Sequence, residues 1–347
     1  MKKIAVIGVG MMAEVGHLPH YQSHPDTVIQ CIVDQQEERA KAMAERFQVP
    51  AFYKDVEAML ANEDIDGASI CTPNSTHLPI ARKLLENGIH ILIEKPIGTD
   101  VAEARNVVEL ALQKNLVCMV GMTQRFRTEA KILKRIIEQG RLGSIYHVRA
   151  QYLRRRGTPQ GWFTNEALAG GGTMMDIGVH ALDLAWWLVG TPTVKSVTGS
   201  LKSGIGDYET LFLKGGWDSA VAGPDKAMSV EDFGSGYFRF EGGLTLNVEA
   251  SWAINGQETD GLCIDIYGKE GGASMQPLCI YHELDGIYVE SKPVFSKNDV
   301  LQEEIYHFID CMLHGKAPVS SGLEGVKVLE MLEGLAHSSQ GDAEYTF

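Results

Sequence analysis

The segment from Gly170 to Asp183 carries the residues best suited to chemistry in this chain of 347 residues. Its three opening glycines give the backbone room to approach a ligand closely. In the helix predicted after them, Asp176, His180 and Asp183 stand at i, i+4 and i+7 and therefore share one face. A carboxylate and an imidazole lie side by side there, with no covalent nucleophile between them. Such a pair is suited to proton transfer.

Glu94-Lys95-Pro96, further upstream, adds a lysine to these candidates. Taking a hydride from a secondary alcohol requires the hydroxyl proton to leave as the carbonyl forms, and a neutral imidazole can accept it near pH 7. A lysine ammonium can stabilise the developing alkoxide. We expect His180 to be the general acid/base and Lys95 its electrostatic partner. We expect Asp176 to orient the hydroxyl groups of the alcohol. The three groups titrate together, so naming a single base is partly a convention.

Each of these residues also has a structural interpretation. Asp176 could cap its helix, His180 could be an interior histidine, and Lys95 could lie on the surface.

Three further histidines raise the question of a metal. His17, His20 and His24 lack acidic or thiolate ligands at a useful spacing. We expect them to be solvated or at helix ends, and no metal is predicted.

A GxGxxA turn runs from Gly8 to Ala13, after the first predicted strand and before a helix. Gly8 and Gly10 permit a tight turn, and Met11 and Met12 open a helix whose free N–H groups favour a pyrophosphate. A strand–helix turn without a ligand is the alternative, but this context favours a dinucleotide.

Asp34 ends the second predicted strand, 26 residues after Gly8. It can accept hydrogen bonds from the adenosine ribose and would repel a 2′-phosphate. Positions 35–38 hold no Arg or Lys, so NAD is favoured over NADP, although Arg39 follows one helical turn later. A helix-capping role for Asp34 is compatible with the ribose contact.

The elements that position these groups follow two patterns. The first third predicts strands at Ile4–Ile7, Val28–Val33, Gly67–Cys71, Ile89–Ile93 and Leu116–Gly121. It predicts helices at Met12–Tyr21, Glu37–Phe47, Val56–Leu60, Leu78–Asn87 and Val101–Lys114. The strands show little polar alternation, which indicates helices on both faces and an α/β, doubly wound parallel sheet.

The pattern changes after about residue 122. The later elements are a helix at Glu129–Gln139, strands at Ile145–Tyr152, Gly236–Phe240, Leu244–Ala250 and Leu262–Tyr267, and helices at Leu301–Leu313 and Leu323–His337. These predict an α+β domain with a large, mostly antiparallel open sheet. We therefore expect domains at 1–122 and 123–347.

Composition limits which binding partners and which cellular compartment we expect for this protein. A net charge of −14 without a basic run argues against nucleic acid and anionic membranes. The first strand begins at the N-terminus, which leaves no room for a signal peptide, and no apolar run approaches the ~18 residues of a membrane helix. Six scattered cysteines, of which Cys31, Cys71 and Cys118 lie in apolar strands as buried thiols, indicate a reduced, cytoplasmic protein.

Four motifs together resemble the glucose-fructose oxidoreductase / inositol dehydrogenase / MocA (Gfo/Idh/MocA) family. They are Gly8–Ala13, Cys71–His77, Glu94–Pro96 and Gly170–Asp183. Glu304–Ile309 resembles the family's closing helix, so the resemblance spans nearly the whole chain. It implies an N-terminal Rossmann domain and an NAD-dependent oxidoreductase acting on a sugar, a polyol or a related compound.

The resemblance also implies residue roles. Lys95 would lie next to the nicotinamide and the substrate, with Glu94 against the nicotinamide ribose. Asp176 and His180 would match the substrate-binding and proton-transfer pair. The residues that would flank the cofactor beyond the fourth strand are Thr72, Pro73, Asn74 and His77. Thr123 stands at a nicotinamide-side position where many members carry Asn.

Family resemblance further implies a homodimer or homotetramer, formed through the outer face of the C-terminal sheet. Arg154, in a run of three arginines ending a strand, and Trp162 are candidates for binding the substrate, because an arginine can bind hydroxyls or a carboxylate and an indole can stack on a sugar. A cluster of interface salt bridges is an equal alternative for the arginines.

Three functions are compatible with these features. The leading one is an NAD-dependent sugar or polyol dehydrogenase. The others are an NAD-using glycosidase, which oxidises, eliminates and re-reduces within one turnover, and a non-catalytic dinucleotide sensor. Retention of Lys95, Asp176 and His180 argues against the sensor.

Overall fold

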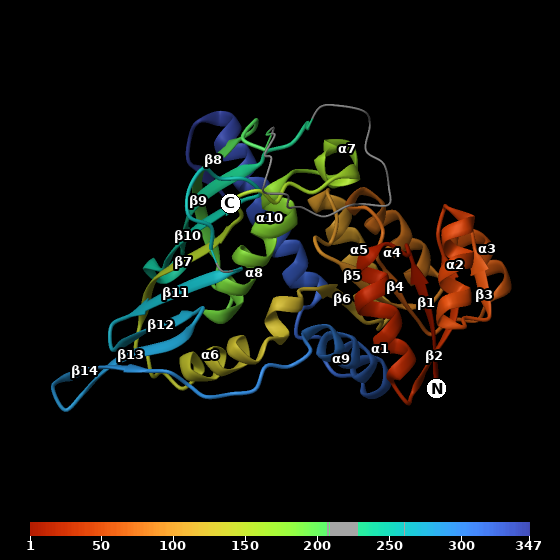
Figure 1. Ribbon diagram of the computed structural model, residues 1–347, viewed down its shortest axis with the longest axis horizontal. Coiled ribbons are helices and arrows are strands. Elements are labelled where there is room, and N and C mark those ends of the chain that lie inside the picture. Colours follow the sequence, from red (N-terminus) through yellow and green to blue (C-terminus); the bar gives the residue numbers. More distant parts are fainter. Residues whose placement is uncertain (207, 209–227, 260) are drawn as a thin grey trace. The chain divides into compact units, whose positions relative to one another are not determined.

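A computed structural model describes residues 1–206, 208, 228–259 and 261–347 (Figure 1). The described chain forms two compact units: residues 1–123 with 299–329, and residues 124–298 with 330–347. The domain boundary between residues 122 and 123 stays a prediction. The structure also shows that Asp299–Leu329, near the C-terminus, packs with the first unit.

The first unit contains a six-stranded parallel sheet in the order β3-β2-β1-β4-β5-β6. Its strands are β1 Lys2–Ile7, β2 Thr27–Val33, β3 Ala51–Tyr53, β4 Gly67–Ile70, β5 His90–Glu94 and β6 Cys118–Gly121. Residues 4–7 of β1 are all buried, as expected for a central strand covered on both faces. The predicted doubly wound α/β sheet is confirmed.

Helices connect these strands, and α9, from the C-terminal part of the chain, belongs to the same unit. They are η1 Ala13–His17, α1 Leu18–Ser23, α2 Glu37–Phe47, α3 Val56–Asn62, η2 Asn74–Thr76, α4 His77–Glu86, α5 Val101–Gln113 and α9 Val300–His314. The segment after α9 adjoins β6, where Ser320 Oγ donates to the carbonyl of Val120 at 2.6 Å. The long helix α10, Gly322–Gly341, begins in the first unit and ends in the second.

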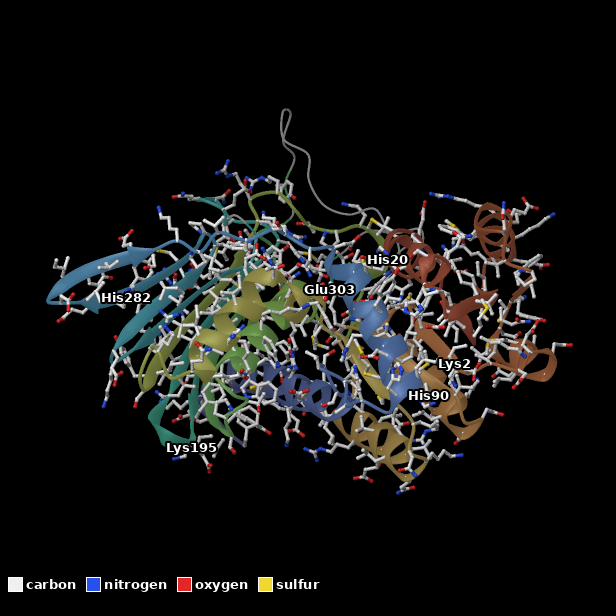
Figure 2. All side chains as sticks on the ribbon, turned by 90° about the horizontal axis from the view of Figure 1, so that it is seen from below. Lys2, His20, His90, Lys195, His282 and Glu303 are labelled. Carbon is white, nitrogen blue, oxygen red and sulfur yellow. The ribbon has the colours of Figure 1, made fainter. Side chains whose placement is uncertain are left out.

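The second unit contains a nine-stranded sheet in the order β14-β13-β12-β11-β7-β10-β9-β8-β15. Its strands are β7 Ile145–Leu153, β8 Val194–Lys202, β9 Phe233–Phe240, β10 Thr245–Ser251, β11 Cys263–Gly268, β12 Gly271–Met275, β13 Leu278–Leu284, β14 Ile287–Ser291 and β15 Tyr345–Thr346. Only the β7–β10 pair is parallel among these described strands. The predicted open, mostly antiparallel sheet is therefore confirmed. Figure 2 shows His282 of β13 and Lys195 of β8 near its opposite ends.

Helices pack on one face of this sheet (Figure 1). The helical elements of the unit are η3 Thr123–Phe126, which begins at the last residue of the first unit, α6 Thr128–Glu138, η4 Gly161–Thr164, α7 Glu166–Ala169, η5 Met174–Gly178 and α8 Val179–Leu188, with η6 Glu241–Gly243 between β9 and β10. Alternate residues of the central strands, such as Val148 and Val248, are buried beneath the helices. The intervening residues lie on the opposite face, which carries exposed aromatic and charged side chains.

The six cysteines, all of them among the described residues, form no disulfide bond. Cys31 and Cys118 are buried as predicted, but Cys71 is partly exposed because it follows β4 in the turn toward η2. Among the described residues, no helix combines the length and the apolar character needed to cross a bilayer.

Candidate active site

The predicted dinucleotide turn has the geometry that a bound pyrophosphate requires. Gly8 has φ +81°, and a Cβ on it would lie 2.7 Å from a methyl carbon of Thr72, so the turn needs glycine there. A Cβ on Gly10 would meet no atom within 4 Å, so the backbone borders open space at this point. Met11 is exposed and Met12 partly so, at the start of the helical segment that follows. These residues therefore fit a dinucleotide.

The Asp34 carboxylate, at the end of β2, is buried and densely hydrogen-bonded. It accepts from the backbone N–H of Val9 at 3.0 Å and of Gln36 at 2.8 Å. Arg39 binds it through Nε at 3.0 Å and Nη2 at 2.7 Å. Asp34 thus ties the glycine turn to β2, and Arg39 neutralises it, which explains how a carboxylate is tolerated in this buried position.

The turn after β4 lies beside the glycine turn. Thr72 and Pro73 are partly exposed, and Asn74 is buried. The His77 ring is buried between two carbonyl oxygens, those of Thr72 at 2.8 Å and Pro96 at 2.9 Å. His77 therefore links this turn to the Glu94–Pro96 segment.

Glu94 ends β5 with a buried carboxylate, while the next residue, Lys95, is partly exposed. The Oε1 atom of Glu94 lies 2.9 Å from Nε2 of His17. Burial opposes ionisation of Glu94, but the His17 hydrogen bond and the nearby positive charge of Lys95 keep the pKa of its carboxyl below the usual value.

A second buried carboxyl belongs to the same unit. Glu304 of α9 accepts a hydrogen bond from the Thr123 hydroxyl at 3.1 Å. Its Oε1 atom has no hydrogen-bond partner among the described residues. Burial and the charge of Glu94 raise the pKa of Glu304 well above its ordinary value. The surroundings of the Glu304 carboxyl that Thr123 binds therefore favour its protonated form.

In the second unit, Asp176 and His180 stand out from their surroundings. Every other residue from 172 to 186 is buried, and these two are partly exposed. The indole N–H of Trp252 donates to Oδ2 of Asp176 at 2.9 Å. The segment therefore presents a partly exposed carboxylate, oriented by a hydrogen bond, and a partly exposed imidazole one turn later.

Asp183 does not share this accessible face. It is buried and binds Arg125 at 2.6 and 2.9 Å, with both side chains at most 1% exposed. The π-helical turn η5 contributes to this difference, because its wider turn shifts the register relative to an ideal α-helix.

The arginine run follows β7, which ends at Leu153, and does not form the end of the strand as predicted. Arg154 stacks over Tyr152 at 5.0 Å, and Arg156 donates to the Ile254 carbonyl at 3.2 Å. Among the described residues, no ion pair involves Arg154, Arg155 or Arg156, and the interface salt-bridge alternative stays a prediction. Trp162, in η4, stacks on Phe163 with ring centroids 4.0 Å apart.

Comparison with known proteins decides the family. Residues 2–122 match the family described as "Oxidoreductase family, NAD-binding Rossmann fold", and residues 131–274 match the "GFO/IDH/MocA C-terminal domain". The D-glucoside 3-dehydrogenase of Escherichia coli (strain K12) is 34% identical, over 82% of this chain and 80% of that protein. The chain belongs to the Gfo/Idh/MocA family. It is an NAD-binding oxidoreductase.

Other members of the family are similar along nearly the full chain. The scyllo-inositol 2-dehydrogenase (NAD(+)) of Bacillus subtilis (strain 168) is 25% identical, over 95% of this chain and 91% of that protein. A levoglucosan dehydrogenase, solved in complex with NADH and levoglucosan, superposes with a TM-score of 0.85 at 23% identity and covers 99% of both chains. The predicted fold class is confirmed by this structural similarity.

The contacts of three residues, His17, Trp252 and Glu231, were not predicted from the sequence. His17 is the last residue of η1, in agreement with the predicted position at a helix end. The alternative prediction that His17 is solvated is wrong, because its side chain is 1% exposed and binds Glu94. Trp252 and Glu231 had no signal in the sequence. Glu231 accepts from the backbone N–H groups of Gly172 at 2.8 Å and Met174 at 3.0 Å, and so anchors the start of η5.

Proposed function

We propose that this protein is an NAD-dependent dehydrogenase that oxidises the 3-hydroxyl group of a D-glucoside or a closely related sugar. The observation that carries the catalytic part is the outward Asp176–His180 pair on an otherwise buried segment. The relative named D-glucoside 3-dehydrogenase, at 34% identity, supports the choice of sugar and carbon.

Bound NAD⁺ supplies the hydride acceptor, so that the alcohol and NAD⁺ give a ketone, NADH and a proton. His180 takes the hydroxyl proton as general base. Lys95 donates a hydrogen bond to the same oxygen while negative charge develops on it. Asp176, held by Trp252, orients the sugar hydroxyls.

The cofactor contacts form part of the proposal. Gly8, Gly10, Met11 and Met12 would receive the pyrophosphate through backbone N–H groups. Asp34 would bind the adenosine ribose, and Glu94 the nicotinamide ribose. The remaining contacts proposed for the cofactor are Thr72, Pro73, Asn74, His77 and Thr123, and those proposed for the substrate beside the catalytic residues are Arg154 and Trp162.

The test uses methyl β-D-glucopyranoside, which has no free anomeric hydroxyl, with deuterium at C3. We expect NADH absorbance at 340 nm and deuterium in the isolated NADH. Lys95→Ala and His180→Ala should each lower kcat by roughly 10²- to 10⁴-fold. Lys195→Ala, on β8, is the control and should match the unaltered protein.

Two other results would contradict the dehydrogenase. Release of methanol from the glycoside without net NADH would indicate the NAD-using glycosidase. Tight NAD binding with no turnover of any aldose, inositol or uronic acid would indicate the sensor.

The uncovered sheet face supports a proposed homodimer or homotetramer. Tyr146, Tyr237 and Tyr267 are 52%, 37% and 37% exposed, and His147 stacks on the latter two. A hollow of about 770 Å³ is lined by residues of β7 and of β11 to β14, including Tyr146 and Tyr267. Exposed aromatic rings of this kind are enriched where proteins associate.

We also propose a cytoplasmic location for the protein. Its six cysteines form no disulfide bond, which supports a reducing compartment.

A further inference from the structure

A chain of buried hydrogen bonds ends on the Glu94 carboxylate within the first unit. His17 Nε2 lies 2.9 Å from Glu94 Oε1, and His17 Nδ1 lies 2.8 Å from Ser69 Oγ. The Tyr21 hydroxyl lies 2.7 Å from the same Ser69 oxygen. His17, Ser69 and Tyr21 are at most 1% exposed, so water does not compete for these bonds.

The chemistry of the groups fixes the direction of this chain. An ionised carboxylate only accepts hydrogen bonds, so Nε2 of His17 carries the hydrogen. In a neutral imidazole Nδ1 then accepts from the Ser69 hydroxyl, and the Tyr21 hydroxyl donates to Ser69. Every donor in the chain therefore points toward Glu94.

The surrounding charges place the negative charge on Glu94. The titratable groups that act on it are His17, Lys95, His77, Glu304 and Cys71. Desolvation by the surrounding protein raises the pKa of Glu304 and of Cys71, and the charge of Glu94 adds to the effect. Glu94 is also buried, yet the pKa of its carboxyl is lowered, because His17 donates to it and the positive charge of Lys95 lies near it.

The second oxygen of Glu94 remains able to accept another donor. Oε2 receives the Lys95 backbone N–H at 3.3 Å. On the β6 side it borders Gly121, where a Cβ would lie 3.3 Å from it. A carboxylate oxygen has two lone pairs, so it can also bind a ligand hydroxyl.

We propose that His17, backed by Ser69 and Tyr21, is a positioning residue that holds the Glu94 carboxylate charged and oriented to accept a hydroxyl of the nicotinamide ribose. The inference rests on the proposed function, in which Glu94 makes that contact. His17 itself touches neither cofactor nor substrate in this role.

Equilibrium binding of NADH, followed by its fluorescence between pH 6 and 9, tests the inference without turnover. Loss of a hydrogen bond to a charged group costs roughly 10- to 100-fold in binding, so His17→Leu should raise Kd by that factor. Without His17, burial favours the protonated form of Glu94, so binding by this variant should weaken further as the pH falls.

Two further variants separate positioning from folding. His17→Gln can donate to Glu94 and accept from Ser69 through one amide, so its Kd should stay within about threefold of the unaltered protein and show no new pH dependence. Tyr21→Phe should shift Kd in the same direction as His17→Leu, but less. His20→Gln, a partly buried histidine of the neighbouring helix α1 (Figure 2), is the matched control and should leave Kd unchanged.

A His17→Leu protein that binds NADH with an unchanged, pH-independent Kd would overturn the inference, even if its Tm fell, and would leave the dehydrogenase proposal standing. Failure of the unaltered protein to bind NADH would overturn both. Imidazole ¹⁵N shifts provide a direct check on the protein without cofactor: protonation at Nε2 supports the chain, and a neutral ring protonated at Nδ1 contradicts it.

Discussion

At the scale of single residues, the indole of Trp252 orients the Asp176 carboxylate. Trp252 follows β10, is fully buried and donates to Oδ2 at 2.9 Å. The bond fixes the orientation of the carboxylate.

Trp252→Phe should therefore lower kcat/KM for the sugar by roughly 10- to 100-fold, because a hydrogen bond to a charged group is lost. Trp186→Phe is the matched control: Trp186 is buried and its indole donates to the Pro192 carbonyl at 2.9 Å, away from Asp176. Both variants should lose stability, measured as Tm, but only Trp252→Phe should lose activity. Equal kinetic losses in the two would contradict the positioning role.

Glu304 gives a prediction about stability and pH. Its folded-state pKa lies well above its unfolded value, so the folded protein binds more protons and loses stability as pH rises above about 4.3. Glu304→Gln removes this loss. The free energy of unfolding of the variant relative to the unaltered protein should increase from pH 5 to pH 8, at up to about 1.4 kcal/mol per pH unit.

Urea unfolding at several pH values measures this difference. Glu303→Gln, an exposed carboxylate of the same helix (Figure 2), is the control and should show no such trend. A Glu304→Gln protein that becomes relatively less stable at high pH would show that Glu304 is charged in the folded state.

The sequence predicted the reactive residue types but not the groups that hold them. The motifs predict Asp176, His180 and Lys95 as reactive residues, and these roles stay a prediction. His17 contacts Glu94 across 77 positions and Trp252 contacts Asp176 across 76, so no local spacing connects either pair. Such contacts depend on tertiary packing alone.

At the scale of elements, η5 depends on a close backbone approach. A Cβ on Gly172 would lie 1.8 Å from the carbonyl oxygen of Glu231, while the Glu231 carboxylate binds the N–H groups that open η5. The glycine is needed for space at this position.

Gly172→Ala should therefore lower the free energy of unfolding by about 3 kcal/mol or more and remove activity, since the backbone must move. Gly256→Ala is the control, because a Cβ there would meet only Ile254, at 3.8 Å. Thermal unfolding and turnover measured on both proteins check this. Normal activity in Gly172→Ala would show that the loop adapts without disturbing Asp176.

Most elements of the first unit were predicted within two residues, because its helices have a clear apolar period and its buried strands form short apolar runs between turn residues. The predictions omitted β3, β8, β12, β13, β14 and β15. β3 has three residues and β15 two, too few for a periodic signal. β12 begins with two glycines, which are unfavourable in strands.

At the scale of the whole molecule, the uncovered sheet face predicts association. Light scattering should give about two or four times the chain mass of 38.1 kDa, since closed symmetric assemblies predominate. Introducing charge with Tyr237→Asp and Tyr267→Asp together should reduce the mass. Val294→Asp, an exposed apolar position after β14, is the control. A monomeric unaltered protein would contradict the proposed assembly.

Residues 299–329 belong to the first unit although they follow most of the second unit in the sequence. This arrangement limits how units can be exchanged between related proteins. Ser320 exchanges two hydrogen bonds with Val120, and the Met312 sulfur lies so near Gly67 that a Cβ there would be 2.5 Å away. A nucleotide-binding cassette cut out as residues 1–122 would lose both partners. Gene fusions that exchange the first unit between relatives would therefore have to carry residues 299–329 with it, so two crossovers are needed where a linear modular protein needs one.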